Sequence, residues 1–462
     1  MPMSLPIRFQ SFALGLLTFL VLLPGTIRAE PPTLDAKAAI LARLKAPEFA
    51  TRDFTISDFG AVPDRDCTAA IAKAIAACHE AGGGRVVVPP GVWRTGAVHL
   101  QSNVNLHLAE GATLRFAADP AKYLPVVLTR FEGIECMNYS PLIYAFGQEN
   151  VAVTGKGTLD GSANWETWWA WNDKSKGKTK QTPARKRLDQ QGTDGTPVAE
   201  RIYGDGHFLR PNFIQPYRCK NVLIEGVTIL NSPMWEIHPV LCTNVIVRGV
   251  TVRSLGTNND GCDPESCRDV LIEDCIFETG DDCIAIKSGR NNDGRRIGVP
   301  SENIVIRRCT MKDGHGGVTV GSEISGGVRN VFVSDCTMDS PNLDRAFRFK
   351  SNAVRGGVIE DIFIRGVEIG RVKRAVLSVE FDYEEGANGP HKPVLRNVRI
   401  ENVTAKSAGR VTLITAFPGA VIEGVRLKDC IFRGVEAADL IKEAAAPILE
   451  NVSIESGKKP KK

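Results

Sequence analysis

Four short polar clusters in the middle of the chain carry the residue types of acid–base chemistry. Asp260 lies in the first cluster, Asp281 and Asp282 in the second, His315 in the third, and two cations in the fourth. Paired carboxylates with different protonation states act as general acid and base, and neighbouring cations bind anionic groups. If a repeating fold stacks the clusters into one exposed site, the combination predicts hydrolysis of a glycosidic bond in an acidic sugar polymer. The clusters are Asn-Asn-Asp-Gly at 258–261, Gly-Asp-Asp at 280–282, Gly-His-Gly at 314–316 and Arg-Phe-Lys at 348–350.

The four clusters share one frame, because each is followed at the same distance by a serine. When the segments are aligned on that serine without gaps, Asp260 falls in the column of Asp282, and Asp281 in that of His315. Any one of these residues alone would be an ordinary turn residue. Several ionisable groups in register would shift one another's pKa values, which an acid–base site uses and a structural turn avoids. The serines are Ser266, Ser288, Ser322 and Ser351.

A phrase that recurs along the chain predicts the fold that stacks the clusters. It begins with Asn or Asp, continues with an apolar residue, any residue and an apolar residue, and ends in a polar pair and Val or Cys. The intervals run from 23 residues (221 to 244) to 36 residues (361 to 397), typical of solenoids. No helical run separates the phrases, which indicates an all-β fold, a single-stranded parallel β-helix. Antiparallel propeller blades are the weaker alternative.

The two ends of the chain are predicted to lie outside the repeat. Residues 1–29 resemble a signal peptide, so export to the periplasm or the medium is expected, without membrane insertion. An N-terminal extension at 30–50 precedes a hydrolase domain at 51–456, and a disordered basic tail fills 457–462. Helical spacing from Cys67 to Ala81 predicts a helix that caps the N-terminal end of the solenoid.

Further expectations concern the cysteines and the binding partners. Most of the twelve cysteines occupy repeat positions that elsewhere hold small apolar residues, so buried free thiols are expected, with Cys67–Cys78 or Cys262–Cys267 disulfides as the alternative. The formal net charge of +4 is near zero without the leader, and no nucleic-acid partner is expected. A monomer is expected.

A long segment at 161–211 interrupts the repeat before the first cluster. It contains four Trp residues, followed by a stretch rich in Lys and Arg. The Trp residues either pack on the solenoid or form an aromatic and cationic wall over one end of the cleft. Such a wall would block a long polymer and favour release of single residues from a chain end.

Further residues near the clusters are candidates for substrate binding. Trp235 falls in the column of Asp260 and could be a sugar-stacking platform, with a buried aromatic as the alternative. His238 is a candidate support or subsite residue. The full set of substrate-binding candidates is Arg348, Lys350, Lys287, Asn258, Trp235, His238 and Tyr383.

At the four clusters the chain resembles glycoside hydrolase family 28, the polygalacturonase family. That family shows Asn-Thr-Asp, Gly/Gln-Asp-Asp, Gly-His-Gly and Arg-Ile-Lys in this order. Here Asn259 stands in place of Thr and Phe349 in place of Ile, and neither position is charged. The resemblance implies a right-handed β-helix and inverting hydrolysis of α-1,4 galacturonosyl links in pectic polysaccharide, without a metal or cofactor.

The resemblance also implies roles for the residues of the clusters. Asp281 would be the general acid, and Asp260 and Asp282 would activate the attacking water. His315 would tune the acid, and the two cations at 348 and 350 would bind the sugar carboxylate.

Other functions remain as alternatives. Rhamnogalacturonan or xylogalacturonan could be the substrate of an enzyme of the same family. A pectate-lyase-like enzyme would need Ca²⁺ and an Arg or Lys base, which the acid-rich clusters do not match. A non-catalytic carbohydrate-binding solenoid would make no use of several carboxylates in register.

Overall fold

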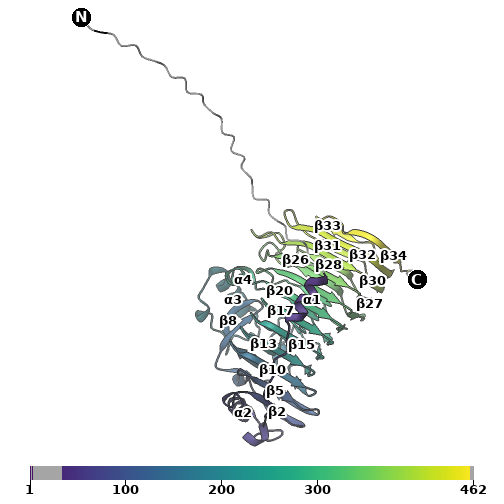
Figure 1. Ribbon diagram of the computed structural model, residues 1–462. Helices are drawn as coiled ribbons and strands as arrows, with labels where there is room; N and C mark the ends of the chain where they lie inside the picture. Colours follow the sequence, from purple (N-terminus) through teal and green to yellow (C-terminus); the bar gives the residue numbers. More distant parts are fainter. Residues whose placement is uncertain (2, 4–33, 458–462) are drawn as a thin grey trace. The chain divides into compact units, whose positions relative to one another are not determined.

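The chain folds into a parallel β-helix, seen in the computed structural model, which describes residues 1, 3 and 34–457 (Figure 1). Most coils contribute strands to three walls, and the strands of neighbouring coils pair in parallel. The predicted all-β solenoid, a parallel β-helix, is confirmed. The predicted signal peptide and basic tail lie, apart from Met1, Met3 and Gly457, outside the described residues. Among the described helices, none has the length and hydropathy needed to cross a membrane.

Two walls belong to one sheet of 23 strands, and the third wall is formed by separate smaller sheets. The first wall consists of β1 (Asp53–Thr55), β2 (Gly84–Val88), β5 (Val104–Leu108), β10 (Glu149–Gly155), β13 (Lys220–Glu225), β15 (Thr243–Arg248), β17 (Arg268–Glu273), β20 (Ser301–Arg307), β23 (Val328–Ser334), β26 (Val358–Arg365), β29 (Val394–Glu401), β32 (Val421–Val435) and β34 (Ile448–Ser456). The second wall consists of β3 (Gly91–Thr95), β6 (Ala112–Phe116), β11 (Thr158–Asp160), β14 (Thr228–Leu230), β16 (Thr251–Ser254), β18 (Ile276–Thr279), β21 (Thr310–Met311), β24 (Thr337–Met338), β27 (Glu368–Val372) and β30 (Thr404–Ala408). The third wall consists of β4 (Val98–His99), β9 (Ile143–Phe146) and β12 (Ile214–Tyr217), then β19 (Ile284–Ile286), β22 (Val318–Val320), β25 (Arg345–Lys350), β28 (Ala375–Glu380), β31 (Thr412–Thr415) and β33 (Leu440–Lys442).

The repeated phrase explains both the interior and the turns of each coil. Its alternating apolar residues point inward and stack, as Val222 does on Val245, and each buried Val or Ile contributes roughly 1.5–3 kcal/mol. The Asn or Asp that opens the phrase adopts a left-handed backbone conformation, with φ of 58° at Asn221 and 57° at Asn244. The side-chain amide of Asn244 donates to Asn221 Oδ1 at 2.8 Å, and that of Asn221 to Asn150 Oδ1 at 2.8 Å. A ladder of amides therefore ties neighbouring coils together at this turn.

Two helices cover surfaces of the solenoid. The predicted capping helix is α2 (Thr68–Glu80), which packs its buried face on β1 and β2 at the N-terminal end. The helix α1 (Leu34–Arg43) lies across the outside of the first wall, where Ile40 packs on an apolar stripe. Lys37 Nζ donates to Ser334 Oγ at 2.7 Å. The stripe consists of Ala152, Leu223, Ile246, Leu271, Val305 and Phe332.

The segment 161–211 forms short helices on the outside of the solenoid. They are η3 (Trp168–Trp171), α3 (Thr182–Asp194) and η4 (Val198–Glu200). The helix α3 packs against α4 (Asn291–Ile297) and against the hairpin that β7 (Val127–Phe131) and β8 (Ile134–Asn138) form. Trp168 is buried, and Trp169 Nε1 donates to the carbonyl oxygen of Ser232 at 2.8 Å. Trp165 is the exposed member, at 51%. Most of the Trp residues therefore pack on the solenoid.

All twelve cysteines are buried free thiols, as the repeat positions predicted. Cys219, Cys242 and Cys267 follow one another on successive coils, and each amide nitrogen of the first two donates to the sulfur of the next. The thiols act as small apolar groups in the stack.

Candidate active site

The structure brings the four clusters into register at one edge of the third wall. Cys262 lies beside Ile284, Ile284 beside Val318, and Val318 beside Phe347, all in parallel. The gap-free alignment predicted from the sequence therefore holds across four coils. The turns are tight: Gly314 has a φ of +128°, and a Cβ there would lie 2.2 Å from the carbonyl oxygen of Asp281.

Among the ionisable members of the clusters, Asp281 and His315 reach solvent. Their side chains are 20% and 44% exposed, and His315 Nδ1 lies 2.8 Å from Asp281 Oδ1. The hydrogen bond to Asp281 raises the pKa of His315, although partial burial opposes the shift. A carboxyl group beside an imidazole at the mouth of the site is suited to exchange protons with a bound molecule.

Asp282 is fully buried and ion-paired. Its Oδ2 lies 2.8 Å from Lys350 Nζ, and its Oδ1 lies 3.5 Å from Arg348 Nη1. Burial favours the neutral acid, but Lys350 and Arg348 outweigh it and hold the pKa of Asp282 well below its usual range. Asp282 is therefore ionised at neutral pH.

Asp260 occupies the same azimuth one coil earlier but has the opposite pKa shift. Burial, with smaller contributions from Asp281 and Asp282, raises the pKa of Asp260 to about 7, while Lys287 opposes the rise. Two carboxyl groups on adjacent coils, whose backbones stack roughly 4.8 Å apart, therefore differ in their protonation. That difference is what separates the roles of paired carboxylates in catalysis.

The site is recessed, which differs from the exposed cluster that the sequence predicted. Asp260, Asp282, Lys287, Arg348 and Lys350 are all buried. Carboxylates and cations compensate one another in ion pairs, which is what allows so many charges to leave water.

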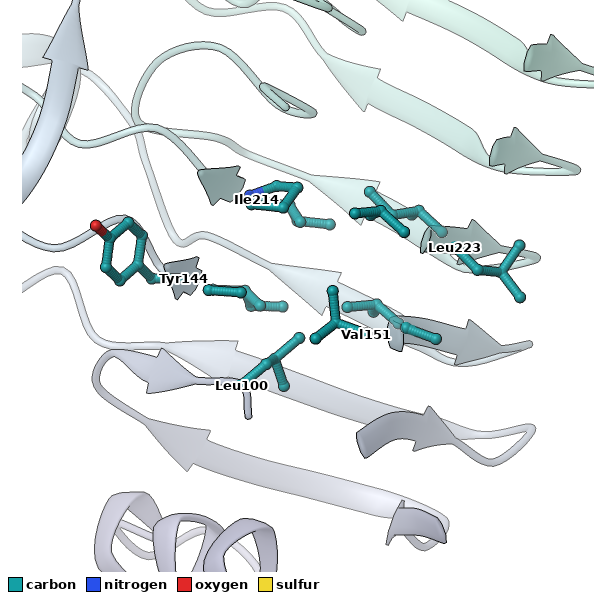
Figure 2. A pocket seen from close by; sticks show the side chains of 12 residues that line it. Leu100, Tyr144, Val151, Ile214 and Leu223 are labelled. Carbon is teal, nitrogen blue, oxygen red and sulfur yellow. The ribbon is translucent and has the colours of Figure 1, made fainter. Parts of the chain in front are cut away.

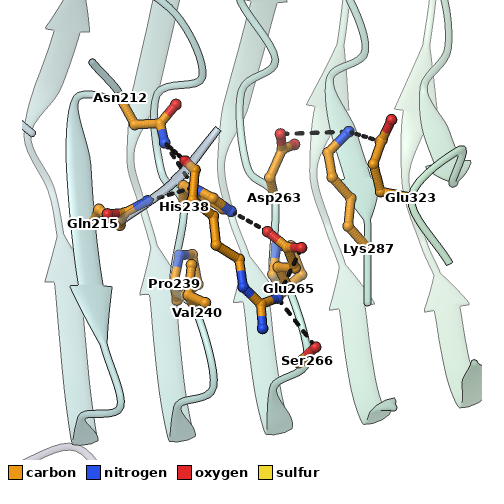
Figure 3. Close-up of polar contacts among 12 residues, drawn as sticks. Asn212, Gln215, His238, Pro239, Val240, Asp263, Glu265, Ser266, Lys287 and Glu323 are labelled. Carbon is orange, nitrogen blue, oxygen red and sulfur yellow. Dashed lines mark hydrogen bonds and ion pairs between the residues drawn. The ribbon is translucent and has the colours of Figure 1, made fainter. Parts of the chain in front are cut away.

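Three candidates for substrate binding are more deeply buried than Asp281 and His315. Lys287 is 3% exposed and pairs with Asp260, so the structure places it as a buried counter-ion of that carboxyl group. Trp235 is 3% exposed, with Lys287 Nζ 4.2 Å from the ring centroid, so it is a buried aromatic and not a stacking platform. His238 is fully buried; its Nε2 lies 2.7 Å from Glu265 Oε2, which leaves a supporting role (Figure 3).

Two other candidates lie beside the cluster. The half-buried ring of Tyr383 has Arg348 Cζ at 5.7 Å and Lys350 Nζ at 5.4 Å from its centroid. Asn258 is also half-buried, and its Oδ1 accepts from Arg210 Nη2 at 2.7 Å. Asn172 Nδ2 lies 3.4 Å from the same oxygen. The segment 161–211 is thus attached directly to the first cluster.

Sequence reasoning missed Glu380, which pairs with Arg348 at 3.1 Å and with Arg345 at 2.8 Å. Glu380 lies beside Lys350 in the register, so extending the alignment by one coil would have found it. Among residues 34–457, no group of three or more His, Cys, Asp or Glu side chains is arranged to hold a metal ion.

A pocket in the solenoid lies away from these residues. Figure 2 shows it between β9–β10 and β12–β13, lined by apolar side chains that include Leu100, Val151 and Leu223. Its lining contains no carboxylate, imidazole or cation, so it offers no acid–base chemistry.

Comparisons with known proteins bear on these residues. A model of glycosyl hydrolases family 28 matches residues 203–445, which contain all four clusters. A solved exopolygalacturonase of Thermotoga maritima is 44% identical, with a TM-score of 0.88, over 92% of this chain and 96% of that one. A "Probable polygalacturonase" of Vitis vinifera is 29% identical over 91% of this chain and 82% of its own length. An exo-poly-α-D-galacturonosidase of Dickeya chrysanthemi is 26% identical over 81% of this chain and 64% of its own length.

These matches confirm the resemblance seen in the four clusters. The chain belongs to glycoside hydrolase family 28 and is a glycosidase.

Proposed function

We propose that this glycosidase hydrolyses α-1,4 galacturonosyl links in pectic polysaccharide with inversion, and that it works from a chain end. The observation that carries the substrate class is the group of Arg348, Lys350 and Tyr383 beside the carboxyl groups. Two cations next to an aromatic ring suit a sugar ring that bears a carboxylate. Relatives named as polygalacturonases support the same class.

The geometry supports a division of labour among the three carboxyl groups. Asp281, at the mouth of the site beside His315, donates a proton to the leaving glycosidic oxygen. A water between Asp260 and Asp282 attacks the anomeric carbon from the opposite face. Asp260, the more basic of the two, takes the proton of that water, and ionised Asp282 orients it. Inversion in one displacement requires an acid and a base on opposite sides of the bond.

The segment 161–211 supports action at a chain end. Its helix α3 packs against α4 and β8, and its Asn172 contacts Asn258 in the first cluster. Arg185 of α3 is bound to Glu132 of the β7–β8 hairpin at 2.6 Å, which fixes the segment in place. The T. maritima and D. chrysanthemi relatives both carry exo-acting names.

We further propose that residues 1–29 are removed on export, that the enzyme acts outside the cytoplasm as a monomer, and that residues 51–456 form one hydrolase domain. The composition of residues 1–29 supports export. The continuous pairing of the first wall from β1 to β34 supports a single domain.

Analysis of products tests the proposal. Polygalacturonic acid should yield galacturonic acid monomer alone, and proton NMR of the first minutes should show the β-anomer. A ladder of oligomers would contradict exo-action, and an unsaturated product absorbing in the ultraviolet would contradict hydrolysis. Release from rhamnogalacturonan or xylogalacturonan, with polygalacturonic acid untouched, would contradict the proposed backbone.

A further inference from the structure

The buried ammonium group of Lys287 lies next to Asp260, the proposed base. Lys287 Nζ lies 3.3 Å from Asp260 Oδ2, 3.4 Å from Glu323 Oε2 and 3.7 Å from Asp263 Oδ2. Figure 3 shows this ammonium between Asp263 and Glu323. We call these four residues the Lys287 cluster. Among the described residues, Lys287 is the one cation within 4.0 Å of an Asp260 oxygen.

The surroundings of the cluster fix Lys287 in place and keep water out. The ring of Trp235 lies under the ammonium at 4.2 Å, and His238 packs edge-on against that ring at 4.8 Å. The carboxyl oxygens of Asp263 and Glu236 have no hydrogen-bond partner among the residues described. Burial without a hydrogen-bond partner favours the neutral form of a carboxyl group.

We propose that Lys287 is a positioning residue that keeps Asp260 able to ionise at the working pH, and that it makes no contact with substrate. This inference rests on the proposed role of Asp260 as the base. Lys287 acts through Asp260: its charge favours the carboxylate form that accepts the proton of the attacking water.

The charges that face Asp260 support this role. Burial raises the pKa of Glu236 and of Asp263 well above the usual range, so both stay neutral. Glu323 stays ionised, because Lys287, Arg355 and Arg290 outweigh its burial and lower its pKa.

The other charged groups around Asp260 shift its pKa in opposite directions. Asp281 and Asp282 favour the neutral form of Asp260, and Lys350 favours the ionised form from a neighbouring coil. Without Lys287, burial and the ionised Asp282 would together hold Asp260 protonated.

Two substitutions should move the pH profile in opposite directions. Lys287→Met should shift the acidic limb of kcat/KM upward by roughly one to three pH units, the effect of an opposite charge at this range. Glu323→Gln should shift the limb downward, because it removes a negative charge that competes for the ammonium. In both variants KM on the plateau should stay within about twofold of the parent. Lys220→Met, which removes an exposed lysine paired with Glu149, is the matched control and should shift nothing.

A measurement without substrate separates this inference from the proposed function. Carbon-13 NMR of protein labelled at the aspartate carboxyls, with Asp260→Asn to assign the resonance, follows the ionisation of Asp260 directly. A higher pKa of Asp260 in Lys287→Met and a lower one in Glu323→Gln would support the inference. If those shifts occur while the acidic limb stays in place, the role of Asp260 as base fails and the inference about its ionisation stands.

Two results would overturn the inference itself. One is an unchanged Asp260 titration in Lys287→Met; the other is a KM raised tenfold or more with an unmoved acidic limb, as for direct substrate contact. If Lys287→Met does not fold, two other variants decide by the same criteria. Glu323→Gln should lower the pKa of Asp260, and Lys287→Arg, which keeps the charge, should leave the titration of Asp260 unchanged.

Discussion

The buried pair of Asp282 and Lys350 gives a quantitative prediction about stability. Replacing Lys350 by Met leaves a fully buried carboxylate without its partner at 2.8 Å. Breaking such a pair costs about 3–5 kcal/mol, and we expect the lower end, about 3 kcal/mol, because Arg348 Nη1 still lies 3.5 Å from Asp282. Asp282→Asn should also destabilise the fold, since it leaves Lys350 unpaired. The double variant should be more stable than the sum of the two losses predicts, by about 2–3 kcal/mol.

The contribution of the Asp282–Lys350 pair to the stability of the fold should depend on pH in a definite direction. The pKa of Asp282 is lowered in the folded state, so the pair contributes stability above the unfolded value near pH 3.9, and that contribution is lost as the pH falls further. Equilibrium urea denaturation of the four proteins at pH 7 and near pH 3 measures both effects. The exposed pair of Lys220 and Glu149 is the control, with an expected coupling below about 1 kcal/mol. Losses that add within about 0.5 kcal/mol at pH 7 would refute a strongly coupled buried pair.

Other predictions concern the acid, the imidazole and the thiols. Asp281→Asn should lower kcat by roughly 10²–10⁴-fold with little change in KM, as initial rates on polygalacturonic acid would show; a variant that keeps full turnover would exclude Asp281 as the acid. His315 should titrate above about 6.5 in proton NMR and return toward that value in Asp281→Asn. Because a raised histidine pKa stabilises the fold at low pH and ceases to do so as the pH rises through that pKa, the same substitution should destabilise the protein more at pH 6 than at pH 9. A thiol reagent should label none of the twelve cysteines in the native protein and all of them in denaturant without reductant; rapid native labelling would contradict their burial.

The fold and the register of the clusters could be predicted because both are periodic in the sequence. Each coil repeats the same phrase, so a gap-free alignment was enough to place Asp260 beside Asp282 and Asp281 beside His315. Alignment gives the azimuth of a residue but not what covers it. Trp235 lies in its predicted column but is buried. Lys287 is enclosed by Glu323 and Asp263, which come from different coils.

The covering of the first wall was also missed, although the sequence contains a sign of it. The middle position of the phrase, treated as free, is apolar at Leu223, Ile246 and Leu271. A strand that is apolar on both faces must be buried on both. The helix α1 supplies that cover, and no local pattern in residues 34–43 indicates which wall it meets.

The long reach of α1 has a consequence for how the chain matures on the ribosome. Its lysine and its acceptor serine on β23 are separated by 297 positions. At typical rates of synthesis, roughly 15–60 s pass between the synthesis of the lysine and that of the serine. The helix is therefore synthesised long before the strands on which it packs. Coils can stack on one another as they are synthesised. The helix α1, in contrast, can pack on the first wall only after β23 has formed. Its packing therefore follows the synthesis of the coils that carry Asp260, Asp281 and His315.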